Sequence, residues 1–163
     1  MNYSVLNTAI VPIMNVDVDV DVTTPTPNGT LFAKDEVFRL GDATVTPLIL
    51  HWASAPNFSM NAQFAIQAPT GDYDKDRAAN AGVNFWLFAP SFAVSYVTST
   101  GLEFSFWFQL NIGTKNDDTD YKNGVEYLQD FSIGQHVGPW RIGLGGYYYK
   151  QISDDKTYMW RIR

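Results

Sequence analysis

The chain has 163 residues, a length that predicts a single domain, and it has no cysteine, which excludes disulfides, thiolate metal sites and a cysteine nucleophile. Its net charge of -6 excludes a basic stripe that could neutralise phosphates, so we expect no nucleic-acid partner. Charged residues make up 17% and aromatic residues 15%, whereas about a quarter of the residues of a soluble domain are charged. This balance indicates contact with an apolar environment.

Alternation with a period of two residues dominates the chain and predicts an all-β fold. No run approaches the roughly 18 to 20 apolar residues of a membrane-spanning helix, and Met1–Val11 lacks the basic stretch of an export signal. The first clear strand is Val16–Val22, where valine and aspartate alternate. Asp17, Asp19 and Asp21 therefore share one face of this strand.

The strands that follow are long and two-faced. Their apolar positions alternate with asparagine, glutamine, serine, glycine and alanine, where a sheet facing water usually carries lysine, glutamate and threonine. Most have about 10 residues, which suits a tilted strand that crosses a bilayer better than a globular strand of about 5 to 6. Their predicted ranges are Asp42–Trp52, Ser59–Ala68, Asn84–Thr98, Leu102–Ile112, Val125–Val137 and Trp140–Lys150.

The connections alternate between short and long, as in an up-and-down barrel of an outer membrane. Tight turns are predicted at Ala55–Asn57, Ser99–Gly101 and Gly138–Pro139, and long acidic loops at Thr23–Gly41, Thr70–Val83 and Gly113–Gly124. The predicted fold class is therefore an antiparallel up-and-down transmembrane β-barrel with about seven or eight strands present. Residues 1–163 are predicted to form one β-barrel domain.

Basic residues are nearly absent from these strands, and only Arg141 stands at the head of one. An arginine or lysine midway on a lipid-facing surface costs roughly 2 to 4 kcal/mol, so the apolar face is predicted to meet outer-membrane lipid. The polar face is then predicted to line an enclosed lumen. Its carboxylates would disfavour anions, and its tryptophan and tyrosines could contact an aromatic solute. The candidate lumen-lining residues are Asp17, Asp19, Asp21, Asn61, Gln63, Glu103, Trp107, Gln109, Asp130, Arg141, Tyr147 and Tyr149.

Motifs of enzymes are missing. There is no nucleophile elbow, zinc-protease motif, P-loop or dinucleotide fingerprint, and the segment Asp72–Asp76 lacks the later glycine and glutamate of a calcium loop. His51 and His136 are far apart in the sequence, and for each a structural role is favoured over metal binding. We expect no catalysis, no cofactor and no metal site, although a Ser/His/Asp site assembled across strands stays open.

Several segments resemble, in order, the bacterial outer-membrane channel family involved in the MetA pathway of phenol degradation. They are Val16–Val22, Gly41–Pro47, Ala68–Asn80 with Asn84–Trp86, Asn116–Gly124, Gly134–Val137 and Gly143–Tyr149. The resemblance covers nearly the whole chain. It implies a single-chain outer-membrane barrel that takes up small hydrophobic or aromatic molecules for degradation, and it supplies no catalytic residues.

Members of that family have earlier and later strands, so we expect this chain to be the middle of a larger barrel, incomplete at both ends. Two alternatives remain open. One is a soluble β-barrel or sandwich that binds an apolar ligand inside, and the other is a fragment without independent activity. The oligomeric state and the solute are left open.

Overall fold

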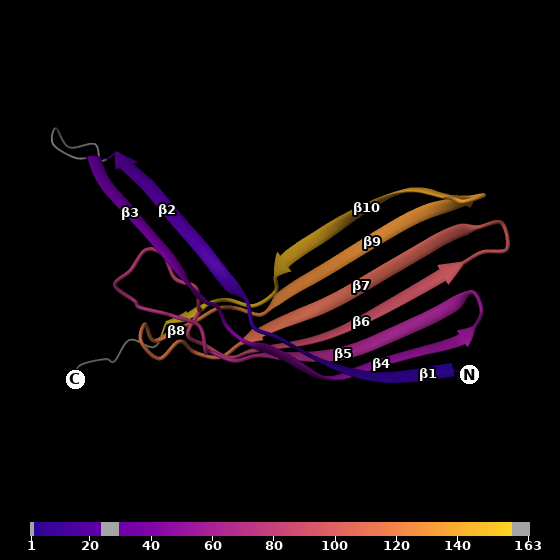
Figure 1. Ribbon diagram of the computed structural model, residues 1–163, viewed down its shortest axis with the longest axis horizontal. Helices are drawn as coiled ribbons and strands as arrows, with labels where there is room; N and C mark the ends of the chain where they lie inside the picture. The colour runs from indigo at the N-terminus through magenta and orange to yellow at the C-terminus, as the bar shows by residue number, and fades with distance from the viewer. Residues whose placement is uncertain (1, 24–29, 158–163) are drawn as a thin grey trace.

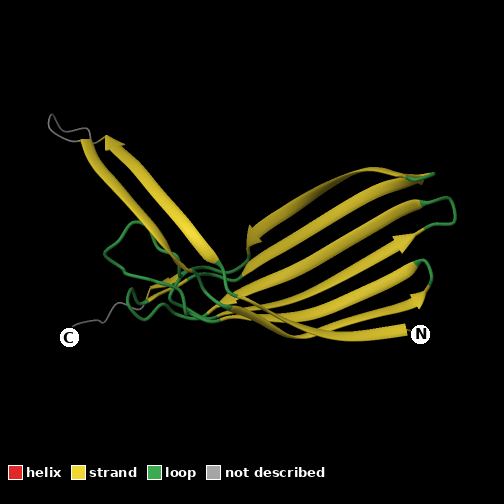
Figure 2. Cartoon of the chain, viewed as in Figure 1, coloured by secondary structure: helices red, strands yellow, loops and turns green. Residues whose placement is uncertain are grey.

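The computed structural model describes residues 2–23 and 30–157, with side chains described for residues 3–20 and 34–157. All its regular elements are β-strands (Figure 2). In the described residues no helix is long and apolar enough to cross a membrane. The strands are β1 (Asn2–Ile10), β2 (Ile13–Thr23), β3 (Thr30–Leu40), β4 (Thr44–Ala55), β5 (Phe58–Gln67), β6 (Leu87–Val97), β7 (Leu102–Gly113), β8 (Tyr121–Lys122), β9 (Glu126–Val137), β10 (Trp140–Gln151) and β11 (Lys156–Thr157).

Seven strands form one antiparallel sheet in the order β1-β4-β5-β6-β7-β9-β10, with β1 and β10 at its edges (Figure 1). The turns β4–β5, β6–β7 and β9–β10 lie at one end, here called the turn-side end. The long connections lie at the other, the loop-side end. Neighbours in the sheet follow one another along the chain, except that β2 and β3 intervene between β1 and β4, and β8 between β7 and β9. This confirms the antiparallel up-and-down arrangement and the predicted short turns.

The predicted strands from residue 42 onwards are confirmed within a few residues at each end. The strand β1 was not predicted. Its pairing with β4 shifts register between Leu6 and Thr8, so the residues that face one side change parity in mid-strand. A β-bulge of this kind hides the alternation that sequence reading depends on.

The segment Thr23–Gly41, predicted as a long loop, contains the strand β3, so that prediction is wrong. Strands β2 and β3 pair with each other in a separate two-stranded ribbon that projects away from the sheet at the loop-side end (Figure 1). Asp17 and Asp19 lie on this ribbon, opposite Glu36 and Lys34. They are therefore not in the seven-stranded sheet.

The base of the ribbon is held by the β5–β6 connection. Val37 is 5% exposed and Ala79 is fully buried, and the backbone N–H of Ala79 donates to Asp35 Oδ2 at 3.0 Å. Arg39 Nε lies 3.9 Å from Asp72 Oδ2. These contacts join segments that are far apart in the sequence and hold the end of the ribbon that lies next to the sheet.

Asp42 organises the junction between the ribbon and the sheet. Its side chain is nearly buried and accepts hydrogen bonds from the backbone N–H groups of Gly71 and Val83, each at 2.8 Å, and from Gln67 Nε2 at 3.1 Å. Gly71 is packed so closely that a Cβ there would lie 2.8 Å from backbone carbon atoms of Gly41 and Gly82. Only glycine allows these backbones to cross at that distance.

The described residues contain no hydrophobic core of ordinary size. The buried hydrophobic residues are Val37, Ala79, Ala81 and Ala89, and no large side chain is fully buried. Large apolar side chains such as Phe92, Ile133 and Leu144 are instead 38 to 65% exposed. The apolar surface of the sheet therefore has no partner within the described part of the chain.

Candidate functional site

The pairing of the strands arranges the polar face of the sheet in rows. Residues directly opposite each other on antiparallel neighbours point to the same face, so a row can be followed from edge to edge. One row crosses the sheet at mid-height and is here called the middle row. It consists of Ser4, His51, Asn61, Ala93, Trp107, Asp130 and Tyr147.

A second polar-face row lies next to the middle row on its loop side. It consists of Leu6, Ile49, Gln63, Ser91, Gln109, Leu128 and Tyr149. Nearer the turn-side end, Glu103 is opposite Gly134, which is opposite Gly143, and Arg141 is opposite His136. The structure thus gathers the predicted residues of the seven-stranded sheet on one face.

In the middle row, the polar groups of three side chains are not used within the described part of the chain. Neither the indole of Trp107, nor the carboxylate of Asp130, nor the hydroxyl of Tyr147 has a hydrogen bond or salt bridge there. Tyr147 is 81% exposed and Asp130 is also exposed. These groups offer an aromatic surface, a donor and an acceptor at one level of the polar face.

Turn-side of the middle row, Glu103 is the centre of a hydrogen-bonded cluster. Its Oε2 lies 2.8 Å from His136 Nε2 and 3.1 Å from Arg141 Nη2, and its Oε1 accepts from Ser105 Oγ at 3.2 Å. A carboxylate can only accept, so His136 carries its proton on Nε2. Ser95 Oγ extends the cluster to Ser105 Oγ at 2.9 Å. The Glu103 side chain is 13% exposed and its charge is thereby compensated.

Loop-side of the middle row, a second cluster runs through amides to a carboxylate. Gln109 Nε2 donates to Asn111 Oδ1 at 2.7 Å, and Asn111 Nδ2 donates to Glu126 Oε2 at 3.0 Å. The hydroxyl of Tyr149 donates to the other oxygen of Glu126 at 2.9 Å. This network holds the side chains along the wall instead of leaving them loose in the space in front of it.

The opposite face of the sheet is apolar and rich in aromatic rings. Trp52 contacts Phe92 with ring centroids 6.4 Å apart, and Phe106 stacks on Phe108 at the same separation. Lys150, at the loop-side end of β10, is the one charged residue that the pairing places on this face within the described strands of the sheet. The two faces therefore differ in chemistry along the full length of the strands.

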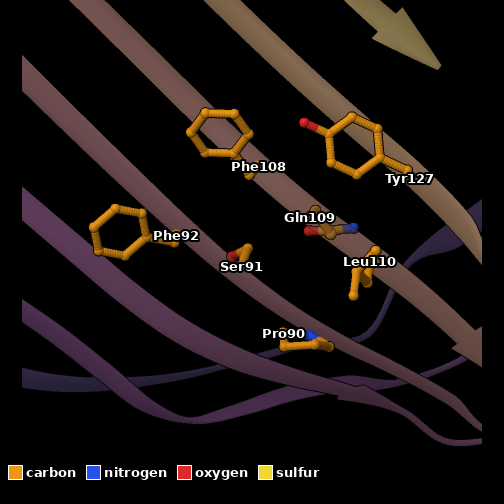
Figure 3. Close-up of a pocket in the computed structure, with 7 residues that line it drawn as sticks. All are labelled: Pro90, Ser91, Phe92, Phe108, Gln109, Leu110 and Tyr127. Carbon is orange, nitrogen blue, oxygen red and sulfur yellow. The ribbon is translucent and has the colours of Figure 1, made fainter.

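The apolar face has a shallow depression at Pro90, bordered by the rings of Phe92, Phe108 and Tyr127 (Figure 3). Its volume is about 250 Å³. Pro90 has no N–H, and the paired positions of β6 and β7 pass from Phe88 to Ser91. On the opposite, polar face, the neighbouring Ser91 Oγ is buried without a hydrogen-bond partner in the described residues. The pairing of β6 and β7 is thus interrupted at this point.

Ion pairs order the connections at the loop-side end. Arg77 Nη1 donates to Asp72 Oδ2 at 2.8 Å, and this hydrogen bond lowers the pKa of Asp72 and raises that of Arg77. The hydroxyl of Tyr121 donates to Asp155, which raises the pKa of Tyr121 and lowers that of Asp155. These loops have defined structure and frame one end of the polar face.

The predicted site residues fall into two groups, one on the polar face of the seven-stranded sheet and one on the β2–β3 ribbon. Asn61, Trp107, Asp130 and Tyr147 share the middle row; Gln63, Gln109 and Tyr149 share the adjacent row; Glu103 and Arg141 are in direct contact. Asp17 and Asp19 are on the ribbon instead, and the side chain of Asp21 lies outside the described residues.

Several further polar-face residues were left out of the candidate set. Among them are His51, Asn111, Glu126 and His136. The alternation of polar and apolar residues along β7 and β9 was sufficient to predict the face of Asn111, Glu126 and His136. His51 was obscured because the pairing of β4 shifts register between Val45 and Leu48. In the part of the chain that the structure describes, no three histidine, aspartate or glutamate side chains form a metal-binding group.

Comparison with known proteins identifies relatives of this arrangement. The family model described as "Putative MetA-pathway of phenol degradation" matches residues 1–158. A crystal structure of an outer membrane channel from Pseudomonas putida F1 superimposes with a TM-score of 0.58 at 21% sequence identity. The match covers 86% of this chain and 61% of that one, so this chain spans less than two thirds of the length of the channel. No curated protein sequence matches significantly.

At this identity the likeness to the channel concerns the fold. It confirms the predicted fold class, because the seven-stranded sheet has the architecture of an outer-membrane barrel wall. The described sheet is open, with β1 and β10 unpaired with each other.

Proposed function

The chain belongs to the MetA-pathway phenol-degradation family. From this premise we propose that it forms part of the wall of an outer-membrane channel for small hydrophobic or aromatic molecules. The apolar face contacts lipid and the polar face lines the path of the solute. The short turns face the periplasm and the long loops face the outside, as is general in bacterial outer-membrane barrels.

The observation that carries this proposal is the separation of the two faces. Only Lys150 is charged on the apolar face of the described sheet, whereas the polar face holds Glu103, Glu126, Asp130 and Arg141. An ionised side chain near the middle of a bilayer costs about 2 to 4 kcal/mol, so lipid contact requires such a face. A lumen tolerates the charges of the other face because water reaches them.

The soluble-barrel alternative fits this surface less well. A soluble protein that enclosed the apolar face would bury its large side chains, but in the described residues none is fully buried. If water covered this face instead, Ile142, Leu144 and Trp140 would form part of one long hydrophobic surface at 65 to 71% exposure. Exposed apolar patches of this extent mark contact with a membrane or a partner.

The middle row gives the solute its principal contact. The ring of Trp107 provides an apolar flat surface, and its N–H and the Asp130 carboxylate are both unpaired within the described residues. A small aromatic molecule with one hydroxyl group can stack on the indole and donate to Asp130. Passage then depends on weak, exchangeable contacts, because a channel must release what it binds.

The proposal is tested with the intact protein in the outer membrane and in lipid vesicles. We expect it to fractionate with outer membranes, to show heat-dependent gel mobility and to raise the flux of phenol across vesicles. The Trp107→Ala variant should reduce the flux of phenol more than that of glycerol, while Lys150→Gln on the other face leaves both unchanged. Recovery in the soluble fraction, or a flux equal to that of empty vesicles, would contradict the proposal.

A further inference from the structure

The cluster at the turn-side end of the polar face has donors to spare. A guanidinium has five N–H donors, and in the described residues only Nη2 of Arg141 is used, in its contact with Glu103. The Arg141 side chain is 64% exposed, whereas that of Glu103 is 13% exposed. The carboxylate of Glu103 is thus already paired, whereas most N–H donors of the Arg141 guanidinium remain available.

A hollow lies beside this guanidinium. It has a volume of about 220 Å³ and is lined by Glu103, Ser132, Ile133, Gly134, Arg141, Gly143 and Leu144. Gly134 and Gly143 are directly opposite each other and supply no side chain to fill it. A Cβ on Gly143 would lie 2.4 Å from the carbonyl oxygen of Ile133, so the close approach of β9 and β10 itself requires glycine there.

The other carboxylates of this face lie too far away to bind the free donors of Arg141. Asp130 precedes Gly134 by four residues on β9, which places it roughly 13 Å further along the strand. That separation exceeds the screening length of about 8 to 10 Å at ordinary ionic strength. Glu126 lies further still, and Glu103 is already bonded to His136, Arg141 and Ser105.

We propose that Arg141, positioned by Glu103 over this glycine-floored hollow, binds the carboxylate of a small organic anion at the turn-side end of the path. This deepens the proposed channel function, on which it rests for its biological role. It also reverses, at this end of the face, the expectation that the lumen disfavours anions. A guanidinium fixed by one carboxylate presents its free edge to a second carboxylate with less loss of side-chain entropy than a free arginine.

The probe pair is benzoate and benzyl alcohol, which share the ring and differ in charge. Binding to the intact protein in detergent at low salt is measured by calorimetry, and contact with the site by the nitrogen chemical shifts of the Arg141 guanidinium. We expect benzoate to bind more tightly than benzyl alcohol and to shift the Arg141 signals. The Arg141→Gln variant should weaken benzoate binding about tenfold or more, the effect of losing a charge-assisted hydrogen bond.

Three further variants separate the site from mere charge and from misfolding. Lys150→Gln removes the same charge from the same strand on the other face, and should leave benzoate binding unchanged. Gly134→Val fills the hollow while keeping Arg141. The smaller change Gly134→Ala should be tolerated, because a Cβ on Gly134 has no neighbour nearer than 3.6 Å, the distance to Arg141 Cγ, and both changes should weaken benzoate binding. Heat-dependent gel mobility reports whether each variant is folded.

The outcomes distinguish this inference from the channel function. Benzoate binding that is unchanged in folded Arg141→Gln, or equal binding of benzyl alcohol, overturns the anion site even if the protein conducts solutes. A protein that binds benzoate through Arg141 but gives no flux across vesicles keeps the site and refutes the channel.

Discussion

The assignment of the two faces can be tested at two consecutive residues of β7. Phe108 lies on the apolar face and Gln109 on the polar face, next to each other in mid-strand. The strand has 12 residues, so it is roughly 40 Å long and, tilted by about 40°, spans about 30 Å of membrane. Phe108 is therefore near the bilayer midplane. We expect Phe108→Arg to destabilise the protein folded in lipid, lowering its free energy of unfolding by about 2 to 4 kcal/mol.

The matched change at Gln109 should cost far less. Gln109→Arg loses the hydrogen bond to Asn111, worth about 1 kcal/mol, and places the new charge close to Glu126. The Phe108→Arg cost corresponds to about a 30- to 900-fold shift in the folding equilibrium. Reversible denaturation in lipid vesicles, followed by gel mobility, measures both. Equal costs, or a greater cost at Gln109, would refute the assignment of the apolar face to lipid.

Three other changes test the packing and the loops. Gly143→Ala should destabilise the β9–β10 pair by about 1 to 3 kcal/mol, and Gly145→Ala by less, because the nearest backbone atom to the new Cβ is at 2.4 Å in the first case and 3.1 Å in the second; denaturant titration compares them. Asp42→Asn removes an acceptor oxygen from a three-donor site and should cost about 1 to 3 kcal/mol, seen as faster proteolysis within residues 68–86. Because Arg77 lowers the pKa of Asp72 in the folded loop, this contact stabilises the loop above the ordinary carboxylate pKa and is lost as the pH falls through the lowered value. Protease cleavage of the loop should therefore rise on acidification, and Arg77→Gln should abolish that rise; a pH profile unchanged by Arg77→Gln would show that another group governs the loop.

The sequence predicted those parts of the fold in which alternation is unbroken. The strands β5, β6, β7, β9 and β10 alternate cleanly, and the candidate residues predicted on them do share one face. The two-residue strand β8 was not predicted, because it lies within the segment Gly113–Gly124 that was expected to be a loop. The strand β1 was missed and the face of His51 left unassigned, because bulges in β1 and β4 change the parity of the alternating pattern. Register shifts arise from pairing between strands, and a single sequence does not display its pairing.

The Val16–Val22 segment shows a different limit. Its alternation was read correctly as a strand, but alternation does not say which sheet a strand joins. The partner β3 was hidden because Thr30–Leu40 mixes charged and apolar residues without a clear period. The site was limited in the same way: the sequence placed Glu103 and Arg141 on one face, but their contact follows from a register that brings Gly134 and Gly143 between them.

The β2–β3 ribbon has a consequence for engineering. It leaves the sheet between β1 and β4, which are themselves directly hydrogen-bonded neighbours. The ribbon can therefore change length without altering the register of any strand in the wall. The end of the ribbon next to the sheet is held by Asp35 and Arg39, so a foreign peptide grafted on the side of Asp35 away from the sheet would leave both contacts intact. In the orientation proposed above, a peptide inserted in this way would be displayed at the cell surface.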